Sequence, residues 1–164
     1  LHDALVRHLR GFARGAPPEL LDPAALVYRE VPFRLPLPAA SASDGGPAWL
    51  DGVIDVLYRR PSDRTWWVLD YKSDESPPGA LAPGYAPQLL AYAWAASRIL
   101  PELADPAWTV GGELLFTAAG LRVEVVEPAP ASVLAERFAA DLALPRAVPA
   151  PLPSPPTRSG TPTL

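Results

Sequence analysis

The sequence predicts an α/β domain in which a mixed β-sheet is covered by helices. The expected elements are, in order, a helix, three strands, a helix, two strands and a helix, within 164 residues. This length is typical of a single domain that can bury a core of its own. Consecutive strands with tight turns, followed by a helical crossover, favour a sheet that contains both parallel and antiparallel pairs.

The first helix and the first strand are separated by a proline-containing segment. Residues 1–15 place apolar side chains at helical spacing and have Gly15 near their end, which predicts an amphipathic helix. Residues 26–37 alternate and are rich in strand-forming types. Because Pro32 and Pro36 lie within this strand, we expect it to be bent or at an edge of the sheet.

The next three elements form the centre of the expected sheet. A turn-rich loop leads into the second strand at residues 49–60, and a short turn leads into the third strand, which begins at Trp66. The alanine-rich residues 86–100 predict a helix, and Pro101 ends it.

The remaining elements complete the domain. Residues 111–118 and 121–127 predict two strands joined by a short turn, and residues 131–144 predict the last helix. Residues 145–164 contain proline, serine and threonine with little to bury, which is typical of a disordered tail or a linker. We therefore expect one domain over residues 1–144, followed by this tail.

The composition excludes several kinds of site. There is no cysteine, so disulfides, thiolate metal sites, iron–sulfur clusters and cysteine nucleophiles are excluded, and any metal must be held by oxygen or histidine. The net charge of −4 provides no global basic field for nucleic acid. No apolar run approaches the roughly 20 residues of a membrane span, and no signal segment is present. We expect a piece of a longer cytoplasmic polypeptide.

The stretch WWVLDYKSDE suggests a charged site at the end of the third strand. Alternation along a strand places Asp70 and Lys72 side by side. If Asp55 on the second strand faces the same side, two carboxylates converge there, and at about 4 Å they repel by roughly 4 kcal/mol. Mg²⁺ would remove this repulsion, and the carbonyl of Tyr71 could join its ligands. The lysine could then orient or deprotonate the attacking water and offset charge on a phosphate.

Other residues support this interpretation without deciding it. An Asp-x-Lys pattern alone is also typical of a solvated strand end or a local ion pair. Gly52, three residues before Asp55, would allow another group to approach closely or the strand to bulge. Gln88 and Tyr92 share a helix face, although the polar edge of an amphipathic helix would explain that spacing equally well.

In combination, GVID, VLDYKSD and QLLAY resemble the motifs of the PD-(D/E)xK nuclease superfamily, and specifically those of the nuclease domain at the C-terminal end of RecB and AddA helicase–nucleases. The matching residues are Gly52, Asp55, Asp70, Tyr71, Lys72, Gln88 and Tyr92. The family also carries an early histidine ligand and a Glu-x-x-Phe strand. LHDAL supplies His2 for the first, and REVPF supplies Glu30 and Phe33 for the second.

The resemblance implies a restriction-endonuclease-like fold that hydrolyses DNA phosphodiester bonds with Mg²⁺ or Mn²⁺. The implied metal ligands are the side chains of His2, Asp55 and Asp70 and the carbonyl of Tyr71. Lys72 would act on the attacking water, and Gln88 and Tyr92 would line the site. Glu30 and Gly52 would support the positions of these site residues without binding the metal themselves. His8 is the other histidine, but it lies beside the apolar stripe, where a packed histidine is commoner than a ligand.

Within this superfamily, the absence of cysteine argues against the branches that hold an iron–sulfur cluster. The leading hypothesis is a Mg²⁺-dependent DNA exonuclease domain, with or without endonuclease activity, that acts in double-strand-break repair and recombination. A helicase motor in the same polypeptide or complex would deliver single DNA strands to it. The alternatives are a stand-alone RecB-like nuclease and a catalytically silent scaffold of the same fold.

Overall fold

The computed structural model describes residues 2–37, 48–60, 64–74 and 82–143. These residues form a five-stranded sheet in the order β1-β2-β3-β4-β5, in which only β3 and β4 are parallel among the described pairs. The strands are β1 (Val27–Pro36), β2 (Trp49–Arg60), β3 (Thr65–Lys72), β4 (Thr109–Phe116) and β5 (Leu121–Ala129). The predicted mixed sheet is therefore confirmed, with the helical crossover between the two parallel strands.

Within the described residues, three α-helices and three short 3₁₀ helices connect and cover the strands. The α-helices are α1 (His2–Gly15), α3 (Ala86–Ile99) and α4 (Ala131–Ala143). The 3₁₀ helices are η1 (Pro18–Leu21), η3 (Ala82–Tyr85) and η4 (Pro101–Ala104). The sequence does not predict the 3₁₀ helices, because a single proline-containing turn is too short to show a hydrophobic period.

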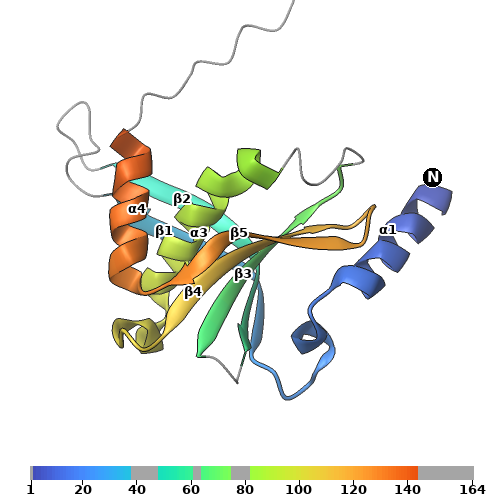
Figure 1. The fold of residues 1–164 in the computed structure, drawn as a ribbon, viewed down its shortest axis with the longest axis horizontal. Coiled ribbons are helices and arrows are strands. Elements are labelled where there is room, and N and C mark those ends of the chain that lie inside the picture. The colour runs from blue at the N-terminus through green and yellow to red at the C-terminus, as the bar shows by residue number, and fades with distance from the viewer. Residues whose placement is uncertain (1, 38–47, 61–63, 75–81, 144–164) are drawn as a thin grey trace, which may run out of the picture.

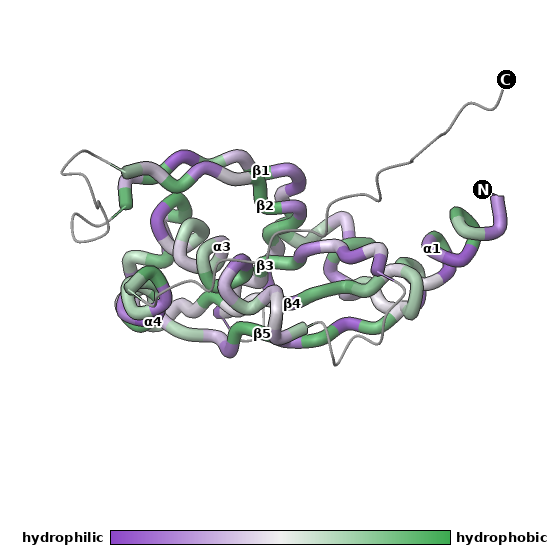
Figure 2. Tube along the Cα trace, turned by 90° about the horizontal axis from the view of Figure 1, so that it is seen from above, coloured by the Kyte–Doolittle hydropathy of each residue, from purple (hydrophilic) through white to green (hydrophobic). Residues whose placement is uncertain are grey.

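Helices cover both faces of the sheet. Figure 1 shows α3 and α4 beside each other at the left of the view, and α1 at the other side of the view. The core on the α3 side includes Trp66, Val68 and Leu114 from the sheet and Leu89 from α3. Figure 2 shows the apolar stretch of β4 in the middle of the molecule, where all but its first residue are buried.

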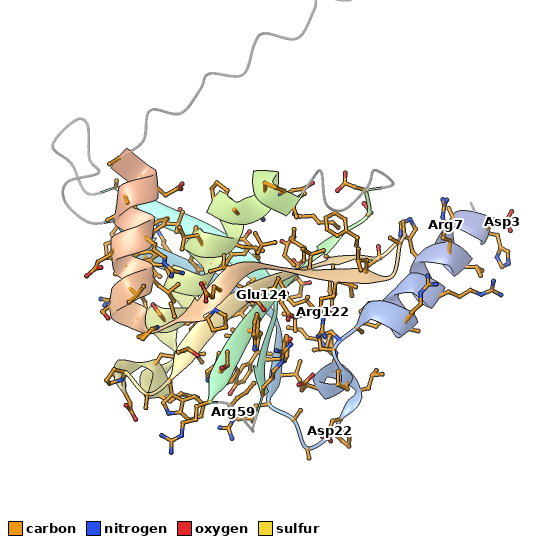
Figure 3. The ribbon with its side chains drawn as sticks, in the orientation of Figure 1. Asp3, Arg7, Asp22, Arg59, Arg122 and Glu124 are labelled. Atoms are coloured by element: carbon orange, nitrogen blue, oxygen red, sulfur yellow. The ribbon has the colours of Figure 1, made fainter. Side chains whose placement is uncertain are left out.

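The opposite face is covered by η1 and by the C-terminal half of α1. Leu20 of η1 and Phe12 of α1 pack there against a cluster that includes Trp67 and Leu69. The N-terminal half of α1 has fewer neighbours, so Leu5 and Leu9 of its apolar stripe are 57% and 59% exposed. Figure 3 labels Asp3 and Arg7 on this part of α1, which projects away from the sheet.

The expected strand positions and the edge position of β1 are confirmed, since β1 pairs only with β2 among the described strands. The proposed tail, residues 145–164, lies outside the described residues. The division of the chain into a domain at 1–144 and a tail therefore stays a prediction. None of the helices in the described part of the chain is long and apolar enough to cross a membrane.

The hairpin of β1 and β2 extends beyond β3. The pairing of β2 with β3 ends at Val56 and Leu69, whereas the pairing of β2 with β1 continues to Trp49 and Pro36. We call this extension, residues 31–37 and 48–54, the β1–β2 arm. Its inner side packs against the core beside α3, so the arm is anchored to the domain through apolar contacts.

The arm begins at an irregular position in both strands. The ladder between β1 and β2 skips Glu30 and Asp55, and Glu30 has a φ of 51°. Ile54 and Leu57 both belong to the core on the α3 side, although residues three apart face opposite sides in a regular strand. The alternation of β2 is therefore interrupted at Asp55.

Candidate active site

Asp70 and Lys72 lie together at the end of β3. The preceding residues of this strand are all buried, so the strand carries Asp70 into the protein, where it is 4% exposed. The Nζ atom of Lys72 lies 2.7 Å from Oδ2 of Asp70. The predicted placement of the two side chains beside each other is confirmed. Lys72 is also the only lysine of the chain, whose other strongly basic side chains are all arginines.

Asp55 reaches the same place from β2. Asp55 and Asp70 directly follow the last ladder pair of β2 and β3, Val56 and Leu69, and the charge of Asp55 acts on Asp70. Its Oδ2 atom accepts a hydrogen bond of 3.0 Å from the backbone N–H of Tyr71. Since the ladder has ended there, the carboxylate supplies the acceptor that a backbone carbonyl would otherwise provide.

The electrostatics of the site follow from burial and from these charges. Burial raises the pKa of Asp70 above its usual range, Lys72 opposes this rise, and the negative charge of Asp55 adds to it. The net direction is upward, because the desolvation of the carboxylate outweighs the attraction of the ammonium group. A cation bound between Asp55 and Asp70 would relieve this cost.

Gln88 and Tyr92, on α3, face Asp70 and Lys72. The Oε1 atom of Gln88 accepts a hydrogen bond of 3.2 Å from Nζ of Lys72. Its Nε2 atom donates to Oδ1 of Asp70 at 3.3 Å and to the hydroxyl oxygen of Tyr92 at 3.1 Å. A neutral amide can accept from an ammonium group and donate to a carboxylate at once, which explains why a glutamine suits this position.

Gly52 leaves space for the aromatic rings of Phe33 and Tyr92, which pack beside this hydrogen-bond network. Phe33 and Tyr92 contact each other edge to face, with ring centroids 5.7 Å apart. A Cβ atom at Gly52 would lie 2.6 Å from Cζ of Phe33 and 3.3 Å from Cε1 of Tyr92. The glycine therefore allows the close approach that the sequence suggested, with the ring of Phe33 filling the space.

Gly52→Ala is expected to destabilise the fold by about 1–3 kcal/mol, because the buried ring of Phe33 must move to admit the methyl group. Urea unfolding followed by circular dichroism measures this loss. Gly84→Ala is the matched control, since nothing lies within 4 Å of a Cβ atom there. Equal midpoints for the two variants would contradict the proposed role of Gly52.

Sequence reasoning missed Tyr85, which lies directly beside Lys72. The Nζ atom of Lys72 is 4.1 Å from the centroid of the Tyr85 ring, and the Tyr85 hydroxyl donates a hydrogen bond of 3.0 Å to Oδ2 of Asp74. This contact places a cation over an aromatic face. The one signal in the sequence was the spacing of three residues from Tyr85 to Gln88, which is too common to identify a site residue.

His8 is connected to the backbone of the site. Its Nδ1 atom lies 2.9 Å from Oγ1 of Thr117. Thr117 in turn donates from its backbone N–H and its hydroxyl to the carbonyl of Lys72, at 2.9 and 3.2 Å. The contact links α1 to the end of β3 and agrees with the expectation that His8 is a packed residue.

The structure does not gather His2 with the two aspartates. His2 is exposed at the start of α1, and within the described ranges no group of three or more histidine, cysteine, aspartate and glutamate side chains is placed to hold a metal ion. The role of His2 as a ligand thus stays a prediction. Glu30 has an exposed side chain and a left-handed backbone, a conformation that is uncommon outside glycine and concentrates at functional sites.

The side chain of Tyr71, the last of the predicted site residues, is partly buried near Arg29, Glu30 and Phe12. Burial raises the pKa of its phenol, Arg29 opposes the rise, and the charges of Asp55 and Glu30 add to it. Its ring contacts Phe12 of α1 with a centroid distance of 5.7 Å. Glu30 thus lies close enough to this part of the site for its charge to act on Tyr71.

The donor atoms at this end of the sheet suit a hard divalent cation. Asp55 and Asp70 offer carboxylate oxygens, and the backbone carbonyl of Tyr71 lies between Asp70 and Lys72 in the chain. The raised pKa of Asp70 indicates that a further positive charge would stabilise its ionised form. Soft ligands are absent, because the chain has no cysteine or methionine.

One hollow in the described part of the surface lies away from these residues. It has a volume of about 430 Å³, lies between α3, β5 and α4, and is lined by residues such as Pro87, Leu90 and Arg137. None of the predicted site residues lines it. The candidate site is thus defined by its polar contacts at the point where β2 and β3 separate.

Two comparisons found known proteins that are similar to parts of this chain. Over 64 residues, the chain is 44% identical to an ATP-dependent helicase/nuclease subunit of Heliobacterium modesticaldum. This match covers 36% of the chain and 4% of that relative. The chain is also similar to the crystal structure of SSO0001, with a TM-score of 0.42 and 17% identity, over 71% of this chain and 48% of the other.

The family model of the PD-(D/E)XK nuclease superfamily matches residues 1–147, which include every predicted site residue. A match over most of the chain, together with the five-stranded mixed sheet, also identifies the fold as restriction-endonuclease-like. The chain belongs to the PD-(D/E)XK nuclease superfamily.

Proposed function

We propose that this chain is a Mg²⁺-dependent DNA exonuclease domain, for which Mn²⁺ can replace Mg²⁺. The observation that carries the proposal is the network of Asp70, Lys72 and Gln88, with Asp55 bound to the backbone N–H of Tyr71 beside them. A buried carboxylate such as that of Asp70 is costly unless it is paired, and here the partly buried ammonium group of Lys72 and the amide of Gln88 both contact it at the end of β3.

Each residue has a separate role in this proposal. Asp55, Asp70 and the carbonyl of Tyr71 would hold the cation, and His2, which the structure does not bring beside the two aspartates, is the further ligand that the family resemblance implies. When bound, the cation supplies Lewis-acid stabilisation of the phosphate. Lys72 holds and orients the attacking water and offsets negative charge that develops on the phosphate oxygens.

The residues on α3 keep this arrangement fixed. Gln88 holds Asp70 and Lys72 in position through its two amide atoms, and its bond to Tyr92 fixes the orientation of the amide. Tyr92 is in turn held by Phe33 over Gly52. Glu30 supports the site near Tyr71. Preorganised groups of this kind lose little free energy to reorganisation during the reaction.

The wider setting is also proposed. Similarity to a helicase/nuclease protein supports a nuclease domain that works with a helicase motor, in the same polypeptide or complex, during double-strand-break repair and recombination in the cytoplasm. The motor would deliver single DNA strands, which fits the net charge of −4, because this domain lacks a global basic field of its own. Residues 1–144 would form the nuclease domain in this setting.

The test is cleavage together with thermal unfolding. Purified protein should degrade linear DNA in the presence of Mg²⁺ or Mn²⁺ but not EDTA, and a closed circular substrate separates exonuclease from endonuclease activity. At a Mg²⁺ concentration of 100 times Kd, linkage predicts a gain of about 2.7 kcal/mol in the free energy of unfolding. No cleavage in Mn²⁺ and no shift in the melting temperature would instead favour a silent scaffold.

A further inference from the structure

The ammonium group of Lys72 is enclosed from several sides. Its Nζ atom lies 2.7 Å from Oδ2 of Asp70, donates to Oε1 of Gln88 at 3.2 Å, and lies over the ring of Tyr85, 4.1 Å from the centroid. The side chain of Lys72 is only 15% exposed, so these neighbours cover most of it. Asp70 acts through its charge and Gln88 through a hydrogen bond, whereas Tyr85 acts through the negative face of its ring.

Asp70 alone cannot fix the position of this ammonium group. Lysine carries its charge on a flexible stem, and its three donors rotate, so a single ion pair leaves the group free to move. Asp70 is also a proposed metal ligand, and a divalent cation would compete with Lys72 for its carboxylate oxygens. Contacts that do not depend on Asp70 are therefore required, and Gln88 and Tyr85 provide them.

Tyr85 is itself held in place by a hydrogen bond. It is the last residue of η3, and its hydroxyl donates to Oδ2 of Asp74 at 3.0 Å. This bond raises the pKa of Tyr85, so the phenol keeps its proton and remains the donor. Tyr85 and Asp74 are both half-buried. The bond thus joins η3 to the residues that follow β3 and keeps the ring beside Lys72.

We propose that Tyr85 is a positioning residue, whose ring holds the ammonium group of Lys72 at the place from which it acts on the attacking water. Asp74 orients the ring through the phenol hydroxyl. The reaction in which Lys72 takes part rests on the proposed function, whereas the contact between the ring and the ammonium group does not. Tyr85 lies outside the motifs GVID, VLDYKSD and QLLAY, so the superfamily resemblance assigns it no role.

Because Lys72 is the only lysine of the chain, its side chain can be observed alone by NMR. Protein made with lysine that carries ¹³C at the ε carbon gives one methylene signal. Protons above an aromatic ring resonate at higher field, so this signal should lie upfield of that of a solvent-exposed lysine. Tyr85→Leu should move it downfield, toward the exposed position, whereas Tyr85→Phe should leave it upfield because the ring face is retained.

The kinetics of DNA cleavage in Mg²⁺ give the second measurement. Tyr85→Leu should lower kcat about 2- to 30-fold, the loss expected for one cation–π contact, with KM nearly unaltered. Tyr85→Phe should keep most of the activity. Asp74→Ala, which frees the hydroxyl without changing the ring, should lower kcat by a smaller factor than Tyr85→Leu does. The rise of the melting temperature with Mg²⁺ should be the same in all three variants, because Tyr85 and Asp74 are not proposed as ligands.

Tyr28→Leu is the matched control for Tyr85→Leu. Tyr28 is a tyrosine that is 47% exposed and stacks on Trp66, with ring centroids 5.8 Å apart. It pairs with Leu57, which lies opposite Val68, four residues before Lys72. The substitution should leave both the lysine signal and kcat unchanged, and melting curves of all variants check that the fold is retained.

Cleavage by the unaltered chain separates this proposal from the proposed function. If that chain cleaves DNA but Tyr85→Leu leaves the lysine signal or kcat unaltered, the positioning role of Tyr85 is wrong. A rise in KM alone would also contradict it, because the ring would then act on DNA and not on Lys72. A lysine signal that depends on Tyr85, without any cleavage in Mn²⁺, would support the placement of Lys72 by the ring and contradict the nuclease activity.

Discussion

Lys72→Ala is expected to lower the rate of DNA cleavage by a factor of about 10² to 10³ or more, while metal binding largely persists. The ammonium group contacts Asp70 at 2.7 Å and Gln88 at 3.2 Å and lies over the ring of Tyr85. No other lysine in the chain can replace it. Initial rates on linear DNA in Mg²⁺ measure the loss of activity, and the rise in melting temperature with Mg²⁺ measures metal binding.

The pH of this experiment matters. Lys72 opposes the upward shift of the pKa of Asp70, so its removal leaves burial and Asp55 to raise that pKa further. Metal binding by the variant should therefore be measured over a range of pH, because a higher pH favours the ionised form of Asp70 that binds a cation. Lys72→Arg is the control for charge, and it should also be impaired because a planar guanidinium does not fit the position of an ammonium group. Activity of Lys72→Ala equal to that of the unaltered chain would contradict the role assigned to Lys72.

Asp70→Asn is expected to abolish both cleavage and the stabilisation by Mg²⁺, which is about 2.7 kcal/mol at 100 times Kd. Without metal the same substitution should raise the melting temperature at neutral pH. Burial raises the pKa of Asp70 above its unfolded value, so the folded chain binds the proton more tightly than the unfolded chain does. Stability from this group is greatest below both pKa values and falls as the pH rises through them.

Melting curves in EDTA across the acidic and neutral range check this sign. The difference between Asp70→Asn and the unaltered chain should be small in acid and should grow as the pH rises, because asparagine carries no charge at any pH. Asp51→Asn is the control for an exposed aspartate, and its melting temperature should change little. An undiminished response of Asp70→Asn to Mg²⁺ would show that the cation binds elsewhere.

Much of the site could be predicted from local periodicity. Alternation along one strand correctly placed Asp70 beside Lys72, and helical spacing placed Gln88 and Tyr92 on one face. These predictions succeed because each pair lies within one regular element, whose geometry is fixed by its backbone. The prolines of β1 likewise predicted an edge strand from the chemistry of a single residue type.

Other contacts depend on how separate elements pack together, which the periodicity of a single element does not predict. A strict period of two places Asp51, Val53 and Asp55 on one face, but the ladder skips Asp55, and its carboxylate binds the N–H of Tyr71. Tyr85 reaches Lys72 across a connection between elements. The position of His2 depends on how α1 packs, which its apolar stripe alone does not determine.

The prolines of β1 also bear on self-association. The N–H of Leu37 donates to the carbonyl of Ala48, just before β2, so the backbone nitrogens of positions 32, 34 and 36 point away from the sheet. Two of these three positions are proline, which leaves Arg34 as the one donor along that stretch of the rim. A second polypeptide could not extend the sheet there as a regular added strand, and this protects an otherwise open arm from fibril-like stacking.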